Sequence, residues 1–379
     1  MRIAIVTDTW PPEINGVALT VHGLAHGLAD LGHAIQVVRP QPADTHLDSH
    51  ELRLEQHFVP GLPLPRYRGL RFGLPVPRRL HRLWRSQRPD AVYLATEGPL
   101  GHSALNAAMA LDIPTCSGLH TRFDHYACHY GLPQLQHWVL AGMRRFHNRA
   151  GATLVATRAL EKELRGQGFA CVQQLARAVD TTRFHPRHRD PALRQAWGVE
   201  ETQPVLLHVG RLAAEKNLSL LLRVHQQLGE SGCPARTVIV GDGPLRAAMQ
   251  AAHPEIIFTG MLQGQALASA YASADLFAFP SLSETFGNVL LEAMASGLPV
   301  VAYNHAAAGE HLLGELGSTR IDCGDEMAFI QQCLRLARCA DSRRQLGRLA
   351  QQQMQALSPQ RVTAEFARLL TSLDRLEAA

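Results

Sequence analysis

Short uninterrupted apolar runs alternate along the chain with longer segments in which apolar residues recur at helical spacing. Such runs are typical of parallel strands that helices cover on both faces. We therefore expect strands at residues 2–7, 34–38, 91–95, 114–117, 153–156, 205–209, 237–240, 256–258, 276–279 and 300–302. Helices are expected at about 17–31 and 288–294. The pattern predicts an α/β fold of doubly wound parallel sheets, which bind ligands at the carboxyl ends of their strands.

The chain length of 379 residues favours two domains. The boundary is expected near the polar, proline-containing segment TTRFHPRHRDP, because a fresh strand begins after Pro204. We expect a first Rossmann-like domain at 1–180, a linker at 181–203, a second Rossmann-like domain at 204–357 and a final helix within 358–379.

Composition excludes several classes of protein. The net charge of +4 is too modest to indicate a nucleic-acid partner. Seven scattered cysteines without a CxxC pair favour reduced thiols in the cytoplasm over disulfides or a zinc site. The amino terminus lacks a signal-peptide pattern, and no run of 18 apolar residues suggests a membrane span. Peripheral attachment to a membrane stays open.

The most informative motif is SETFGNVLLEAMASGLPVVA, which begins at Ser283. Gly287 breaks the chain before the expected helix, and a helix that opens after a glycine turn offers free N–H groups to a phosphate. Glu292 is placed to accept hydrogen bonds from a ribose diol, and Glu284 lies in the loop where a sugar would sit. The alternative is a surface helix with two incidental glutamates.

A second motif, VGRLAAEKN, directly follows the strand expected at 205–209. Arg211 and Lys216 lie in a strand-to-helix loop, where two cations can neutralise a diphosphate leaving group. The chain contains only one other lysine, Lys162. The alternative is a solvated helix start with a Glu–Lys pair.

Two further loops follow strands of the first half. In TWPPEINGVA, Gly16 would let the backbone approach a phosphate or sugar closely. In GLHTRFDHY, His120 lies at the carboxyl end of a strand, although a lone histidine among 20 is more often an ordinary surface residue. Candidate acceptor contacts in these loops are Asp8, Trp10, Asp124 and Tyr126.

Several motifs are missing from the sequence. It contains no D-x-D metal clasp, no GxxxxGK phosphate loop, no HExxH and no GxGxxG. These absences disfavour a metal-dependent nucleotidyl-sugar enzyme, an NTPase or kinase, and a dinucleotide-dependent dehydrogenase. No cofactor and no bound metal are expected.

Taken together, these motifs resemble the retaining GT-B glycosyltransferases of family four, over nearly the whole chain from TDTWPPEINGVA to FPSLSETFGNVLLEAMASGLPVVAYNHAAA. The similarity is greatest to members that glycosylate lipids, such as GDP-mannose-dependent α-mannosyltransferases and sulfoquinovosyl or other diacylglycerol glycosyltransferases. The resemblance implies two Rossmann-like domains that face each other across a cleft. The first would bind the acceptor and the second the nucleotide-sugar, and the last helix would cross back to the first domain.

The resemblance also implies residue roles. Arg211 and Lys216 would bind the donor diphosphate, Gly16 would lie by the phosphate or sugar, and His120 would contact the sugar near its reactive carbon. Glu292 would bind the ribose, and Met261 and Leu262 would face the base. Glu284, together with the backbone of Phe286, Gly287 and Asn288, would bind the sugar hydroxyls. The amides of Val289 and Leu290 would bind the β-phosphate.

This chain departs from its relatives at two places. It has Arg177-Ala178-Val179-Asp180 where relatives often have RGVD, and Asn304, His305 and Gly309 where they have DYAAA-R. The second departure lies close to the expected donor site, so the donor is less securely implied than the reaction.

The sequence therefore predicts a metal-independent, retaining hexosyltransferase that uses GDP-mannose or a UDP-hexose and glycosylates a membrane lipid. Alternatives are a soluble or polysaccharide acceptor, a sugar-nucleotide epimerase or phosphorylase-like enzyme, and a non-catalytic nucleotide-sugar-binding partner. The base, sugar, acceptor and oligomeric state are left open.

An arginine-rich segment suggests where such an enzyme would work. Residues 57–88 contain no acid, and apolar residues such as Phe72 and Trp84 are interleaved with eight arginines: Arg66, Arg68, Arg71, Arg78, Arg79, Arg82, Arg85 and Arg88. One interpretation is a solvated loop and helix with apolar positions turned inward. The other is a peripheral surface for the anionic inner face of the cell membrane, with Trp84 or Phe72 at the interface.

Overall fold

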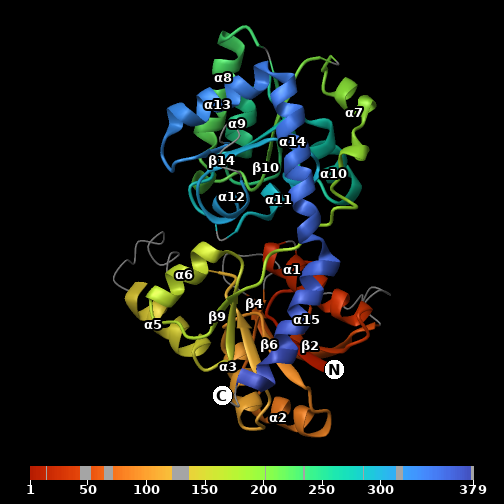
Figure 1. Ribbon diagram of the computed structural model, residues 1–379, viewed down its shortest axis with the longest axis vertical. Helices are drawn as coiled ribbons and strands as arrows, with labels where there is room; N and C mark the ends of the chain where they lie inside the picture. Colours follow the sequence, from red (N-terminus) through yellow and green to blue (C-terminus); the bar gives the residue numbers. More distant parts are fainter. Residues whose placement is uncertain are drawn as a thin grey trace. The chain divides into compact units, whose positions relative to one another are not determined.

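The computed structural model describes residues 1–13, 15–42, 53–63, 71–121, 136–200, 202–233, 235–284, 286–312 and 319–376. The chain folds into two compact units. Unit 1 comprises Met1–Ala178 together with Pro359–Ala379, and unit 2 comprises Val179–Ser358. Each unit has its own parallel sheet (Figure 1).

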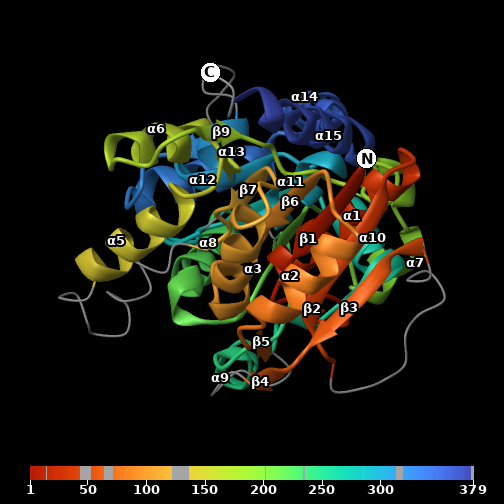
Figure 2. The ribbon, with the colours of Figure 1, turned by 90° about the horizontal axis from the view of Figure 1, so that it is seen from below.

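The sheet of unit 1 has the strand order β3-β2-β1-β6-β7-β8-β9, and all neighbouring strands are parallel. Figure 2 shows β1, β2 and β3 side by side. A separate antiparallel pair is formed by β4 and β5. The strands are β1 (Arg2–Val6), β2 (Ala34–Pro40), β3 (Glu55–Val59), β4 (Gly61–Pro63), β5 (Arg71–Gly73), β6 (Ala91–Leu94), β7 (Thr115–Gly118), β8 (Ala152–Val155) and β9 (Val172–Gln174).

Helices cover both faces of this sheet, and every residue of β1 after the first is therefore buried. Ile3 and Ile5 belong to a core with α1 and α15, whereas Ala4 and Val6 belong to a second core with α2 and α3. The helices described in unit 1 are α1 (Gly16–Asp30), α2 (Pro77–Ser86), α3 (Pro99–Met109), α5 (Gln136–His147), α6 (Arg158–Gly166) and α15 (Pro359–Leu376).

The last helix, α15, is part of unit 1. Val362, Phe366, Leu370 and Leu373 recur at helical spacing and are buried in the core with Ile3 and Ile5. Figure 1 shows α15 beside β6 and α1. The amino-terminal and carboxyl-terminal parts of the chain thus build one hydrophobic core.

The sheet of unit 2 has the order β12-β11-β10-β13-β14-β15, again with all neighbours parallel. Its strands are β10 (Val205–Val209), β11 (Arg236–Val240), β12 (Ile257–Gly260), β13 (Leu276–Phe279), β14 (Val300–Tyr303) and β15 (Arg320–Ile321). Its described helices are α7 (Pro191–Ala196), α8 (Leu218–Glu230), α9 (Arg246–Ala252), α10 (Gly264–Ser273), α11 (Asn288–Ala295), α12 (Ala306–His311), α13 (Glu326–Arg338) and α14 (Ala340–Met354), with short 3₁₀ turns at Pro186–His188, Ala214–Lys216 and Gln355–Leu357.

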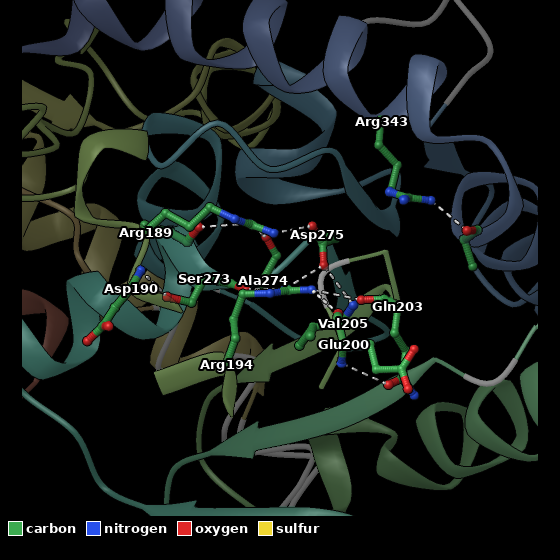
Figure 3. Close-up of polar contacts among 12 residues, drawn as sticks. Arg189, Asp190, Arg194, Glu200, Gln203, Val205, Ser273, Ala274, Asp275 and Arg343 are labelled. Atoms are coloured by element: carbon green, nitrogen blue, oxygen red, sulfur yellow. Dashed lines mark hydrogen bonds and ion pairs between the residues drawn. The ribbon is translucent and has the colours of Figure 1, made fainter. Parts of the chain in front are cut away.

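Residues 181–203, which the sequence suggested as a linker, are packed onto unit 2. Asp275 accepts hydrogen bonds from Arg189 at 3.0 Å and from Arg194 at 2.8 Å (Figure 3). Arg194 is buried and also donates to the carbonyls of Ser273 and Gln203. The segment is thus anchored by charge-assisted hydrogen bonds to the loop before β13.

The fold class predicted from the sequence is confirmed: in both sheets the first strand has two strands on one side, and the later strands follow on its other side. All ten expected strands are present, with ends shifted by at most about two residues. The sequence analysis missed β3, β9, β15 and the β4–β5 pair. These strands are short or polar, or lie at the edges of their sheets.

Candidate functional site

The two strongest motifs meet at one edge of unit 2. The strand order reverses between β10 and β13, and at such a switch point the loops that leave adjacent strands open a crevice for a ligand. The loop with Arg211 and Lys216 leaves β10, and the loop with Glu284 leaves β13. The topology therefore brings these motifs together although 68 positions separate Lys216 from Glu284.

An ion pair joins the two loops. The Nζ atom of Lys216 donates to Oε1 of Glu284, and both side chains are largely buried, at 16% and 12% exposure. The ammonium group also lies 5.9 Å from the centre of the Phe279 ring. Arg211, by contrast, is exposed. The loop thus presents one anchored cation and one that is accessible to solvent.

The turn before α11 depends on a glycine. Gly287 has φ 94°, a left-handed conformation that residues with a side chain rarely adopt. Among the described residues, no side chain caps α11, so the amide of Val289 donates no hydrogen bond to a capping side chain. The amide of Leu290 already donates to the Gly287 carbonyl at 3.0 Å. Of the two amides expected at a phosphate, Leu290 is therefore the less available.

Glu292 has a partner that the sequence did not reveal. The hydroxyl of the fully buried Tyr271 donates to Oε2 of Glu292 at 2.9 Å and lies 3.2 Å from the Val289 carbonyl. Burial raises the pKa of Glu292 to about 7, against the opposing effects of the Tyr271 hydrogen bond and the Arg183 charge. The carboxyl group is therefore held in one orientation and changes charge near neutral pH.

A small pocket of unit 2 lies beside these residues. Its lining includes Phe279, Ser281, Glu284, Phe286 and Leu290, and also His305 from one of the two departures from the family pattern. His305 Nε2 donates to the Ser281 carbonyl at 2.9 Å, which ties the β14 loop to the β13 loop. The departure at residues 304–309 thus lies against the predicted donor residues.

The other two predicted donor residues, Met261 and Leu262, follow β12 at the same edge of the sheet. Met261 is 58% exposed and Leu262 is partly buried. An exposed apolar residue at the carboxyl end of a strand is available to contact a planar base.

In unit 1, His120 follows β7 and is held by Tyr93 of β6 and by Arg177, which lies after β9. Its Nε2 lies 2.7 Å from the Tyr93 hydroxyl, and its Nδ1 lies 2.6 Å from Nη2 of Arg177. Tyr93 and Arg177 are both buried. The sequence analysis gave no role to Tyr93 and noted Arg177 only as part of a departure from the family pattern.

The expected acceptor residues are not all available. Trp10 is only 2% exposed and belongs to the core of unit 1, so the expectation that it contacts an acceptor is wrong. Asp8 is bound by the Thr96 hydroxyl and the Gly73 amide at 2.8 Å each, at the switch point between β1 and β6. Asp124 and Tyr126 lie outside the described residues.

Gly16 begins α1 and is exposed, so its backbone is accessible. The next two amides, of Val17 and Ala18, already donate to the Asn15 side chain at 3.1 and 2.8 Å. A phosphate at this helix start would have to compete with that cap.

The arginine-rich segment is amphipathic where the structure describes it. Arg78, Arg79, Arg82 and Arg85 are exposed on α2, whereas Leu80 and Trp84 are fully buried. The expectation that Trp84 reaches a membrane interface is therefore wrong. Arg88 donates to the carbonyls of Leu111 and Asp112, and Arg66 and Arg68 lie outside the described residues.

No helix among the described residues combines the length and the apolar character that a membrane crossing requires.

Two Rossmann-like units in one chain place this protein in the class with the GT-B fold. A sucrose-phosphate synthase from Thermosynechococcus elongatus has this fold, with a TM-score of 0.78 and 17% identity over 99% of both chains. Residues 14–183 match the model of Glycosyltransferase Family 4, and residues 203–339 match Glycosyl transferases group 1.

Two curated relatives narrow the class. A GDP-mannose-dependent alpha-mannosyltransferase of Mycobacterium tuberculosis is 38% identical over 80% of this chain and 79% of its own. An alpha-monoglucosyldiacylglycerol synthase of Streptococcus pneumoniae is 26% identical over 80% of this chain and 71% of its own. The chain belongs to the family 4 glycosyltransferases, as its motifs indicated, and it is a glycosyltransferase.

Proposed function

We propose that this enzyme transfers a hexosyl group from GDP-mannose or a UDP-hexose to a membrane lipid, with retention of configuration and without a metal ion. The observation that carries the proposal is the Lys216–Glu284 pair at the switch point of unit 2. In this pair, a cation that would bind a diphosphate lies beside a carboxylate that would bind sugar hydroxyls. The names of the relatives supply the candidate donor and the lipid acceptor.

In the proposed reaction, the bond between the sugar's anomeric carbon and the β-phosphate oxygen breaks, and its electron pair goes to the phosphate. Arg211, Lys216 and the start of α11 stabilise the developing negative charge. The acceptor hydroxyl forms the new bond on the same face, and its proton passes to the departing phosphate. No protein nucleophile is needed, and Glu284 positions the sugar.

Glu292 then holds the ribose, and His120 contacts the donor sugar near its reactive carbon. Met261 and Leu262 face the base. Because the chain departs from its relatives at residues 304–309, the proposal includes both guanine and uracil as the base of the donor.

A thermal-shift screen of GDP, UDP and ADP tests the donor part of the proposal. A nucleotide at 100 times its Kd adds about 2.7 kcal/mol to the free energy of unfolding. GDP or UDP should raise the melting temperature, and the matching sugar nucleotide should be hydrolysed slowly without acceptor. Turnover should persist in excess chelator. Loss of activity on chelation, with recovery on adding manganese, would refute the metal-independent mechanism.

A further inference from the structure

The environment of His120 fixes where its proton lies. Arg177 Nη2 is 2.6 Å from Nδ1, and a guanidinium group can only donate hydrogen bonds. Nδ1 must therefore accept, with its lone pair. A neutral imidazole carries one N–H, so the proton is on Nε2, which donates to the Tyr93 hydroxyl oxygen at 2.7 Å.

The fold holds both partners in place. Tyr93 lies on β6, is fully buried, and packs its ring edge-on against Phe366 of α15 at 4.9 Å. Gly118 lies beside the pair: a Cβ atom there would come within 2.2 Å of the Tyr93 hydroxyl and 2.6 Å of His120 Nε2. Only glycine at position 118 leaves room for this contact.

No described group that acts on His120 favours a second proton. Arg177 is cationic and faces Nδ1, and burial, Arg177 and His147 all lower the pKa of His120. Burial raises the pKa of the Tyr93 hydroxyl, so it stays neutral and offers no negative charge. The imidazole consequently has no lone pair free to remove a proton from an acceptor.

We propose that Arg177 and Tyr93 are positioning residues that hold His120 neutral, with its proton on Nε2, in one orientation toward the donor sugar. This inference rests on the proposed function, because the contact of His120 with the donor is part of it. Arg177 matches the arginine of the RGVD pattern that relatives often have, and the departure in this segment is Ala178 in place of the glycine.

The protonation state is measured directly by NMR on the full chain labelled with ¹⁵N-histidine. Long-range ¹H–¹⁵N correlations distinguish the two tautomers, and the signals of His120 are identified by their loss in His120→Gln. We expect the Nε2–H form throughout about pH 5.5–8.5. An Nδ1–H form, or a titration midpoint near the ordinary histidine value of about 6.5, would overturn the proposal.

Kinetics test the positioning role. Arg177→Met should free Nδ1 and remove a nearby cation, so the pKa of His120 should rise from its lowered value although burial still opposes protonation. The kcat of the variant should therefore gain an acid limb at higher pH than in the wild type. Because a displacement of about 1 Å can lower a rate about 10²-fold, kcat at pH 7.5 should fall by a factor of about 10 to 10². Arg177→Lys, which keeps a cationic donor, should restore the wild-type profile. Unchanged kcat and pH profile in Arg177→Met would overturn the role.

Tyr93→Phe should lower kcat about 10-fold and leave the KM for the donor within about twofold. Its control is Trp84→Phe, which removes the buried indole N–H of α2 in unit 1, a group that makes no hydrogen bond among the described residues. Equal effects of both variants on kcat would count against a specific role for Tyr93. If NMR shows the Nε2–H form but His120→Gln keeps normal turnover, the donor contact in the proposed function fails while the assigned proton position stands.

Discussion

At the scale of single residues, the two glutamates of the SETFG motif have different partners. Glu284 pairs with Lys216, a cation from another loop, whereas Glu292 accepts from a neutral phenol, Tyr271. A bound diphosphate would compete with Glu284 for the same ammonium group. Glu292 has no such competitor, and its charge depends on pH. These differences make the proposed roles of the two residues separable by experiment.

The cation pair gives the first prediction. Arg211→Ala and Lys216→Ala should each lower turnover by about two to three orders of magnitude, because each removes a charge that stabilises the leaving diphosphate. The melting temperature of Arg211→Ala should stay unchanged, since Arg211 is exposed. Lys162→Ala, at the other lysine of the chain, is the control: it is exposed on α6. Near-normal activity in both cation variants would refute the assigned donor site.

The glutamates give the second prediction. Glu292→Ala should weaken nucleotide binding by about 1.5–3 kcal/mol, the usual contribution of hydrogen bonds to a charged group. Glu284→Ala should chiefly lower turnover and leave GDP or UDP affinity nearly intact, because it contacts the sugar. Titration calorimetry of both variants with the free nucleotide tests this. Equal losses of nucleotide affinity in the two variants would contradict the separate roles proposed for Glu284 and Glu292.

The third prediction concerns pH and stability. The pKa of Glu292 is about 7 in the folded protein and 4.5 ordinarily, so the unfolded chain releases this proton first as the pH rises. Wild-type stability should therefore lose on the order of 3 kcal/mol from Glu292 between about pH 4.5 and pH 7. Glu292→Gln keeps an acceptor for Tyr271 but does not titrate.

Chemical unfolding of both proteins at pH 4.5, 6 and 7.5 measures the effect. The free energy of unfolding of Glu292→Gln, relative to wild type, should rise steadily with pH and level off above about pH 7. A difference that is constant with pH would mean that folding does not shift the pKa of Glu292.

Sequence patterns identified the residues of the motifs but not their partners. Lys216 and Glu284 follow strands and stand out by residue type and spacing. Tyr271 lies 21 positions from Glu292, and Tyr93 lies 27 positions from His120. Nothing in the local sequence of either tyrosine indicates that it contacts a site residue. The exposure of Trp10 and Trp84 was misjudged because the local sequence does not show which way a side chain points, and both tryptophans are buried.

At the scale of elements, continuous apolar runs were sufficient to predict the central strands of both sheets, since these strands are buried on both faces. The edge strand β3 has the sequence EQHFV, in which three polar residues precede two apolar ones. The edge strand β15 has only two residues. Pairing with a neighbour, which depends on the tertiary fold, defines such strands more than their own sequence does.

The helix α2 carries the fourth prediction. With Leu80 and Trp84 buried, the helix turns Arg78, Arg79, Arg82 and Arg85 outward. Each arginine near an anionic leaflet contributes about 1 kcal/mol, so four give reversible binding without an aromatic anchor. Vesicle co-sedimentation should increase with anionic lipid and decrease with salt. Replacing all four by glutamine should abolish most of it.

The matched control removes the same charge elsewhere. Arg335, Arg338, Arg344 and Arg348 are exposed on α13 and α14, and their replacement by glutamine lowers the net charge equally. Binding should survive in this variant. If the wild type ignores anionic vesicles at low salt, a soluble acceptor replaces the lipid in the proposed function.

At the scale of the whole molecule, the division into units does not follow the order of the chain. Unit 1 is completed by α15, whereas unit 2 is continuous from Val179 to Ser358. The amide of Val179 donates to the Leu357 carbonyl at 3.0 Å, so the chain leaves and re-enters unit 1 at neighbouring points. Cutting the chain before Val179 and after Ser358 therefore removes no strand from either sheet.

This arrangement gives the last prediction. Residues 179–358, expressed alone, should fold and bind GDP or UDP, because the core, Lys216, Glu284 and Glu292 all belong to unit 2. Residues 1–178 alone should not fold cooperatively. They lack Val362, Phe366, Leu370 and Leu373, each at most 3% exposed in the intact protein. Four such side chains contribute about 6–12 kcal/mol, which is comparable with the whole stability of a typical domain of about 5–15 kcal/mol.

Joining residues 1–178 to 359–379 by a short Gly/Ser linker should restore cooperative unfolding, since Val179 and Leu357 are in hydrogen-bond contact and the gap to be bridged is small. The same fusion with Phe366→Ser and Leu370→Ser is the control and should remain unfolded. Circular dichroism and thermal melting measure both. A stable fragment 1–178 would show that α15 is only an addition to unit 1, and failure of the linked fragment would show that unit 1 needs unit 2 in order to fold.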